Sequence, residues 1–600
     1  MQHLDGDFGR AFAGAKGRVM RPASGGAKRL NKDVFPDLRR GLWIYGPLLL
    51  FVRDMNPPAW STILRLYGQA AAPLYADAFR ENLVGWKAAA KPAGLEEAEL
   101  LFTTAEKEDS SSSAAATGGG ASAGVAAARK LTIKRSQTLA KTLRTAGGGG
   151  AKSPTEGSRG AGQLMSAEVF GGAMDEMAPL ISQEQNFVVE FFHASGRGTG
   201  RDFGELVAAA PLPGDRRGPG DMRAAGAIET DREMAGAVRG TMEQLFASFA
   251  PEMGALLEWA VAGDPTQGVG VMACLAKHAF YLQDTGQEFL VQLLEALAAR
   301  LRALWGKFVD EQVRAIEDTR VRVKKRRGVM GFVKTFPHFA AAVESVFAAV
   351  AREDYEREAA WTGEVRRLVD EAYARLNRAM FERLRVIARE NPGPGAGHGQ
   401  QRVGGAGPGA EDPEDKEVLN YHVLLIENMN HYVEEVEDGG KEGVLAEWRG
   451  KAVLERKEAM DAYVSRVITR PLGKLLDFLD TAESLLTSHP TTPTAIASRP
   501  TYSRKTARNL FAQYDGKEIR RGVETLRKRV EKHFGDADEE VLSRQLVGLV
   551  GKECERAYER TIERMERLVT LVWPVVEGEK GVEVDFTRED VRAAFKSLQR

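Results

Sequence analysis

Cysteine and long apolar runs are scarce in this 600-residue chain. The two cysteines, Cys274 and Cys554, lie far apart within helical patterns, so a disulfide framework is excluded and we expect two reduced, packed thiols. The longest mostly apolar run, residues 43–52 (WIYGPLLLFV), contains a glycine and a proline and is too short to span a bilayer. The first residues, MQHLDGDFGR, lack the apolar core of a signal peptide. We therefore expect a cytosolic protein that touches a membrane only from outside it.

An excess of one charge is also missing. The chain has 83 basic and 84 acidic residues, which gives a formal net charge of -1 and no general attraction to nucleic acid. Hydrophobic residues make up 43% and charged residues 28%, which is typical of a soluble chain long enough for several domains.

Motifs of catalysis are absent from the sequence as well. Residues 147–153 (GGGGAKS) lack the glycine spacing of a phosphate-binding loop, and residues 268–273 (GVGVMA) lack the βαβ context of a dinucleotide site. The nine histidines are scattered, and His422 and His431 are too far apart to form a metal pair on one helix face. We expect no enzyme activity, no metal, no cofactor and no small-molecule substrate.

Helical periodicity is what the chain does have. In the run from Thr285 to Phe336, apolar residues recur three or four positions apart, and no proline occurs before Pro337. This pattern predicts one amphipathic helix of roughly 40 residues and about 60 Å, which is too long for the core of a compact enzyme. Strand patterns are nearly absent, apart from a short alternation at residues 581–586. The predicted fold class is all-α, with consecutive helical bundles stacked into an elongated rod.

Changes in composition divide the predicted rod into segments. Stretches rich in Ser, Ala, Gly and Pro cannot bury enough apolar surface to order themselves. We expect an unstructured start at 1–29, helical bundles at 30–105, 165–390 and 415–600, a disordered linker at 106–164 with a basic segment at 128–144, and a Gly/Pro linker at 391–414. The basic segment is either a tether or a peptide that folds on a membrane or partner. Near the C-terminal end, Thr587 and Asp590 predict an approximate capping box, with Phe586 and Val591 placed to staple it.

A dense basic block ends the predicted long helix, with no acid between Thr319 and Lys334. It comprises Arg320, Arg322, Lys324, Lys325, Arg326 and Arg327. The block is either a solvated face paired with neighbouring acids or a contact for anionic lipid or an acidic partner. A second basic patch covers residues 504–532. Neither carries the interleaved aromatic residues that stack on bases, so we expect no nucleic acid partner.

Six stretches, in order along the chain, carry a resemblance to a known family. They are residues 30–56 (LNKDVFPDLRRGLWIYGPLLLFVRDMN), 128–144 (ARKLTIKRSQTLAKTLR), 181–193 (ISQEQNFVVEFFH), 308–339 (FVDEQVRAIEDTRVRVKKRRGVMGFVKTFPHF), 470–486 (RPLGKLLDFLDTAESLL) and 520–536 (RRGVETLRKRVEKHFGD). These stretches resemble the C-terminal helical region of the exocyst complex component one (Sec-three) family, and fungal members most closely.

The resemblance implies a non-catalytic subunit of the eight-protein exocyst, which tethers secretory vesicles to the plasma membrane before fusion. It implies the other exocyst subunits as partners, anionic phospholipids (phosphoinositides among them) as further ones, and a cytoplasmic, peripheral location at sites of secretion. The alternative is a peripheral membrane or nucleic-acid binding module that acts through its basic helices.

In one respect the chain departs from the family. The family's N-terminal pleckstrin-homology domain and the coiled coil after it would lie before Leu30, where this sequence leaves no room for them. We therefore do not carry over the phosphoinositide and GTPase contacts of that domain, and expect either a truncated gene model or a fragment.

The predicted rod can be tested by small-angle scattering. A compact globule of this length has a radius of gyration of about 25 Å. Because helical bundles that stack end over end lengthen the particle, we expect a clearly larger radius and a pair-distance distribution with a long tail. A value close to that of the globule contradicts the rod.

Overall fold

The computed structural model of the chain is built almost entirely from α-helices. It describes residues 2–23, 28–91, 101–102, 164–194, 232–283, 285–320, 328–351, 358–390, 413–436, 444–488, 493–534, 540–574 and 581–597. Within these ranges the only sheet is a short antiparallel ribbon of β1 (Met20–Pro22) and β2 (Lys28–Leu30). The predicted all-α class is therefore confirmed.

The chain divides into two compact units. Unit 1 comprises Met1–Leu101, Ala115–Gln312 and His338–Ala372, and unit 2 comprises Phe102–Ala114, Val313–Pro337 and Tyr373–Arg600. The helices that lie wholly in unit 1 are α1 (Gln2–Ala15), α2 (Val34–Leu42), α3 (Gly46–Met55), α4 (Pro57–Lys87), α7 (Ser166–Phe191), α9 (Arg232–Leu245), α10 (Phe249–Ala262) and α11 (Gln267–Leu282). A 3-10 turn, η2 (Trp43–Tyr45), joins α2 to α3. The division falls within α12 (Glu288–Glu317), α13 (Gly331–Ala351) and α14 (Glu358–Glu390).

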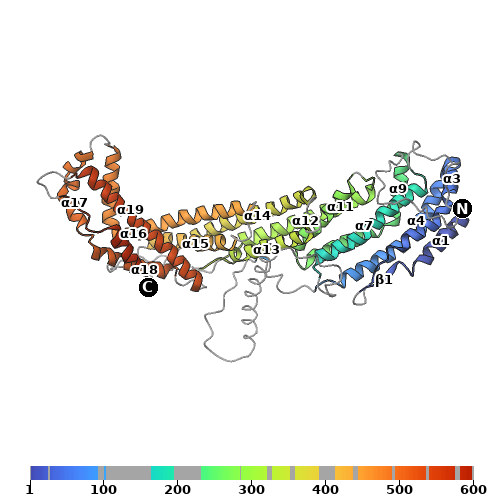
Figure 1. Cartoon of the computed structure of the whole chain (residues 1–600), viewed down its shortest axis with the longest axis horizontal. Coiled ribbons are helices and arrows are strands. Elements are labelled where there is room, and N and C mark those ends of the chain that lie inside the picture. Colours follow the sequence, from blue (N-terminus) through green and yellow to red (C-terminus); the bar gives the residue numbers. More distant parts are fainter. Residues whose placement is uncertain are drawn as a thin grey trace, which may run out of the picture. The chain divides into compact units, whose positions relative to one another are not determined.

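In unit 1, α4 is the central helix, and it lies between α1 and α7 (Figure 1). The Asn56 side chain caps α4 by accepting a hydrogen bond from the Ala59 backbone N–H at 3.1 Å, and prolines fill the first turn, where no intrahelical donor is needed. Trp60, Tyr67 and Phe79 on α4 are all buried. These aromatic side chains of α4 therefore form part of the core of unit 1.

The start of the chain is helical, so the prediction that residues 1–29 lack structure is wrong. Phe8 and Phe12 of α1 are buried and pack edge-on against Tyr67, with ring centroids 5.4 and 5.6 Å apart. Leu4 and Ala15 extend the same buried face. Because this apolar stripe finds a partner on α4, its burial outweighs the high glycine content of the segment.

The predicted boundary between residues 30–105 and 165–390 does not separate two units, because residues 30–101 and 165–312 both belong to unit 1. Arg39 of α2 and Glu184 of α7 form a salt bridge in the core, with the Arg39 Nε atom donating to Glu184 Oε2 at 2.9 Å. These residues are only 3% and 1% exposed. From α4, Tyr75 donates to Glu184 Oε2 at 2.6 Å and Tyr67 donates to Glu184 Oε1. Burial and the nearby carboxylate raise the pKa of both tyrosines, so they remain donors at neutral pH.

The predicted helix from Thr285 to Phe336 is interrupted. α12 ends at Glu317 after about 45 Å, and α13 begins only at Gly331. Between them the Thr319 hydroxyl bonds back to the Ala315 carbonyl at 2.9 Å, and Gly328 has a φ of 110°, a conformation that interrupts any helix. Pro337, which we expected to follow the end of the long helix, lies inside α13.

Unit 2 is a second helical assembly. Its remaining elements are α15 (Pro413–Val436), α16 (Val444–Ser488), η3 (Pro493–Ser498), η4 (Pro500–Tyr502), α17 (Arg504–Phe511), α18 (Gly516–Phe534), α19 (Glu540–Val572) and α20 (Arg588–Ser597). α16 packs along α15 and, further on, against α18 and α19. Phe478 of α16 stacks on Trp573, whose indole N–H donates to the Tyr502 carbonyl at 2.8 Å.

Two local predictions for unit 2 are confirmed. The Thr587 backbone N–H donates to Asp590 Oδ2 at 2.9 Å and the Asp590 N–H donates to Thr587 Oγ1 at 3.3 Å, which is the expected capping box. Cys554 is buried and forms no disulfide, and the same is true of Cys274 in unit 1. Burial raises the pKa of Cys554 to about 12. The alternation at residues 581–586 forms no strand.

Replacing the buried carboxylate should destabilise unit 1 strongly. Glu184→Ala leaves the Arg39 guanidinium charged in an apolar interior, so we expect urea unfolding to show a loss of about 3–5 kcal/mol. Glu81→Ala is the matched control, because Glu81 pairs with Lys28 at 3.0 Å and both side chains are about half exposed. The control should lose no more than about 1 kcal/mol. Equal effects of the two substitutions contradict a structural role for the buried pair.

Candidate interaction surfaces

The described ranges offer no metal centre and no membrane span. Among these residues, no group of three or more His, Cys, Asp or Glu side chains could hold a metal ion. Nor does any helix found there have the length and apolar character needed to cross a bilayer. The cluster of Arg39, Glu184, Tyr67 and Tyr75 is a buried polar network whose members bond to one another, which is typical of a structural role.

The basic block predicted as a contact site lies largely outside the described residues. Arg320 is exposed, and nothing is described for Arg322, Lys324, Lys325, Arg326 and Arg327. The residues on either side of the block form hydrogen bonds with other helices of unit 2. Before it, Arg383 of α14 donates two hydrogen bonds to the Thr319 carbonyl, at 3.1 and 2.6 Å.

After the block, two backbone N–H groups bond to side chains of α15. The Gly328 N–H donates to Glu427 Oε2 at 3.0 Å, and the Met330 N–H donates to Asn428 Oδ1 at 2.7 Å. Glu427 and Asn428 are themselves buried, so these anchors sit in the packed interior of unit 2. The positions at which the chain enters and leaves the block are therefore fixed.

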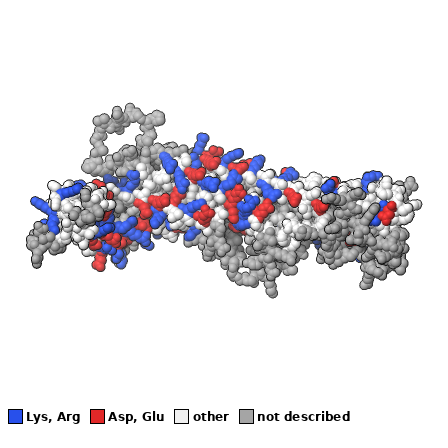
Figure 2. All heavy atoms as spheres, turned by 90° about the horizontal axis from the view of Figure 1, so that it is seen from above, with Lys and Arg blue, Asp and Glu red and all other residues white. Residues whose placement is uncertain are grey.

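The second basic patch, residues 504–532, is extensively paired. On α18, Arg527 donates to Glu531 at 2.6 Å and Lys528 donates to Glu524 at 2.9 Å. The hydrogen bond from Lys528 lowers the pKa of Glu524. The described part of the face in Figure 2 likewise shows Lys and Arg interspersed with Asp and Glu. For these α18 residues the pattern favours a solvated helical face.

An apolar row on η2 and α3 is exposed, and the sequence pattern did not reveal it. It consists of Ile44, Leu48, Phe51 and Met55, which are 57, 46, 50 and 69% exposed. Their spacing of four, three and four residues places them along one face, whereas Leu49 and Leu50 of the same helix are buried. Other large exposed apolar side chains, such as Val84 and Leu454, stand singly on their helices. The sequence signal for this exposed row was the apolar run at residues 43–52. In a helix its apolar side chains point in several directions, and only one face can pack against the core.

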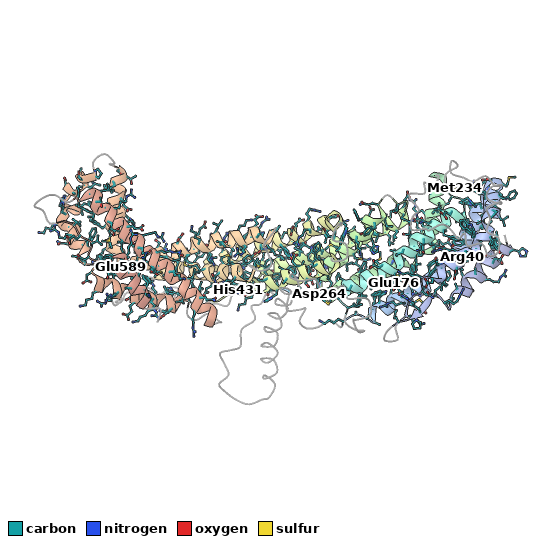
Figure 3. All side chains as sticks on the ribbon, in the orientation of Figure 1. Arg40, Glu176, Met234, Asp264, His431 and Glu589 are labelled. Carbon is teal, nitrogen blue, oxygen red and sulfur yellow. The ribbon has the colours of Figure 1, made fainter. Side chains whose placement is uncertain are left out.

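Charged residues border this apolar row at both ends. Arg40, labelled in Figure 3, lies about one helical turn before Ile44 and pairs with Asp37 at 2.8 Å. At the other end Arg53 pairs with Asp54 at 2.9 Å and donates to the His193 carbonyl at 2.6 Å. An apolar centre with a polar rim is the usual anatomy of a protein contact surface.

The fold and these surfaces define the class as all-α proteins made of packed helical bundles. Within this class the chain belongs to the exocyst complex component Sec3 family, because the model of that family's C-terminal part (Exocyst complex component Sec3, C-terminal) matches residues 191–574. The predicted family is therefore confirmed. Three of the stretches that carried the resemblance, residues 308–339, 470–486 and 520–536, lie inside this match.

Curated relatives agree with the family match. The chain is similar to mouse "Exocyst complex component 1", at 21% identity over 71% of this chain and 42% of the relative. The fruit fly protein of the same name is 23% identical over 62% of this chain and 36% of the relative. "Exocyst complex component SEC3A" of Arabidopsis thaliana is 21% identical over 56% and 32%. The chain thus spans less than half the length of these relatives.

A solved structure gives a more distant comparison. Yeast Exo70 aligns with all of this chain and 94% of its own, at 9% identity and a TM-score of 0.41.

Proposed function

We propose that the chain is a non-catalytic subunit of the exocyst and takes part in tethering secretory vesicles to the plasma membrane during exocytosis. Membership of the Sec3 family supports the assignment to this complex. The proposed partners are other exocyst subunits, and the proposed location is the cytoplasm and the inner face of the plasma membrane at sites of secretion.

The observation that carries this proposal is the exposed apolar row of Ile44, Leu48, Phe51 and Met55. A soluble helix rarely leaves four large apolar side chains in line on its outer face. The 4-3-4 spacing matches the seam along which two helices interlock side chains. We therefore propose that the row binds an amphipathic helix of another exocyst subunit.

Charge placed in the middle of the row should weaken assembly. The double change Leu48→Glu and Phe51→Glu puts two carboxylates where an apolar helix would dock, so we expect at least a tenfold fall in the recovery of other exocyst subunits with the tagged full-length protein. This corresponds to at least about 1.4 kcal/mol of binding energy. Quantitative mass spectrometry of the purified assembly measures the recovery.

Leu454→Glu is the matched control, because Leu454 is 62% exposed and stands alone on α16. It should leave recovery unchanged. Because the substituted positions are exposed, circular dichroism and the melting temperature should stay close to those of the unaltered protein. Unchanged recovery with the double variant contradicts the proposed contact, and failure of the unaltered chain to recover any exocyst subunit contradicts the assignment to the complex.

We also propose that the basic block, Arg320 to Arg327, contacts anionic phospholipid. Each basic residue close to an anionic leaflet contributes about 1 kcal/mol, which permits reversible contact without anchoring. The anchors at Thr319, Gly328 and Met330 support this proposal, since they fix the positions of the residues on either side of the block.

Charge reversal tests the lipid contact. Changing Lys324, Lys325, Arg326 and Arg327 to Glu should reduce flotation with phosphatidylserine vesicles at least tenfold and leave recovery of exocyst subunits intact. A control reverses four exposed basic residues that each pair with a glutamate on their own helix: Lys307, Arg367, Lys451 and Arg556. Equal loss of flotation in both variants would show that overall charge, and not the block, governs the contact.

A further inference from the structure

A cavity of about 220 Å³ opens between α16, α18 and α19 in unit 2. Its charged lining consists of three arginines, Arg470, Arg521 and Arg529, and one carboxylate, Glu518. Glu518 pairs with Arg521 at 3.9 Å, and arginine is the predominant charged residue of the lining. Arginine is the side chain best suited to oxyanions, because its planar fork donates two parallel hydrogen bonds.

A buried hydroxyl without a partner lies in the same cavity. Tyr558 of α19 lines it and is 1% exposed, and its hydroxyl has no hydrogen-bond partner within the described part of the chain. An unpaired buried hydroxyl costs about 1–3 kcal/mol, so such groups in folded proteins are normally paired or bind something. Burial also raises the Tyr558 pKa, which keeps the hydroxyl protonated and able to donate.

The backbone next to this hydroxyl leaves space open. Gly522 lies within α18, where glycine is less stable than alanine by roughly 0.5–1 kcal/mol. A Cβ atom at this position would lie 3.4 Å from the Tyr558 hydroxyl oxygen and 3.2 Å from the Pro471 Cβ atom. The missing side chain therefore keeps the cavity open beside the Tyr558 hydroxyl.

We propose that this cavity binds a phosphate monoester. Guanidinium groups of the lining pair with oxygens of the phosphate, and the Tyr558 hydroxyl donates to one of them. The phosphate belongs to a soluble phosphorylated compound or to the head group of a lipid, and the two sources share this chemistry.

Two probes distinguish the sources. Titration calorimetry of the full-length protein with glycerol 3-phosphate tests the soluble ligand, and flotation with phosphatidylcholine vesicles containing phosphatidic acid tests the lipid. Saturable binding tighter than about 1 mM in either assay supports the proposal, and the assay that is positive identifies the source. Binding in neither assay overturns it, and equally tight binding of acetate overturns the assignment to phosphate.

Three substitutions connect binding to the cavity. Tyr558→Phe removes only the hydroxyl and should weaken binding about tenfold, as expected for a hydrogen bond to a charged group. Arg470→Gln should weaken it by at least the same factor, and Gly522→Ala should narrow the space beside the hydroxyl. Arg556→Gln on α19 is the control, because Arg556 is exposed and pairs with Glu553 outside the cavity lining. Equal affinity of the control and the three cavity variants overturns the proposed site.

Thermal unfolding separates binding from folding. Without ligand, Tyr558→Phe should melt at the same or a higher temperature than the unaltered protein, because it removes a buried donor that lacks a partner. Saturating glycerol 3-phosphate, or phosphatidic acid vesicles if only the lipid binds, should raise the melting temperature of the unaltered protein more than that of the variant. An equal rise in both proteins overturns the role of the hydroxyl.

Discussion

Unit 1 depends on one buried ion pair between Arg39 and Glu184. A charge buried without a partner costs several kcal/mol, so the guanidinium and the carboxylate must meet, and they do so only when α2 and α7 pack together. The hydroxyls of Tyr67 and Tyr75 extend this requirement to α4. Three helices are thereby fixed in one register. This explains why residues 30–101 and 165–312 belong to one unit despite the long low-complexity stretch between them.

The surfaces proposed for contacts follow from how this core is filled. The run at residues 43–52 has more apolar side chains than the core accepts, so Leu49 and Leu50 are buried while Ile44, Leu48, Phe51 and Met55 remain outside. In unit 2, the ends of the basic block are fixed by polar groups of the neighbouring helices α14 and α15. In both units, packing inside the bundle decides what the outside presents to a partner.

The cavity beside Tyr558 shows a different use of helix packing. Gly522 and Pro471 are poor residues for helix interiors, yet they face each other across the contact between α18 and α16. Because Gly522 has no side chain, a cavity remains between the helices. Arginines line this cavity, and so does the Tyr558 hydroxyl, which has no hydrogen-bond partner among the described residues. The basic residues of the stretch 504–532 were visible in the sequence. The sequence did not show which of these basic residues line a cavity, because the cavity forms only where α18 packs against Arg470 of α16 and Tyr558 of α19.

The sequence alone determined the features that depend on near neighbours. Helical periodicity and the capping box of Thr587 and Asp590 followed from local patterns, because an amphipathic face or a cap involves residues within about one or two turns. The reduced state of the two cysteines and the family could also be predicted from the sequence. The tertiary structure decided the rest. It made a helix of residues 2–15 by giving Phe8 and Phe12 a partner on α4, ended α12 at Glu317, and left Ile44 and Phe51 exposed. Each of these outcomes depends on what packs against a segment, and a periodic pattern shows that a face is apolar without showing what covers it.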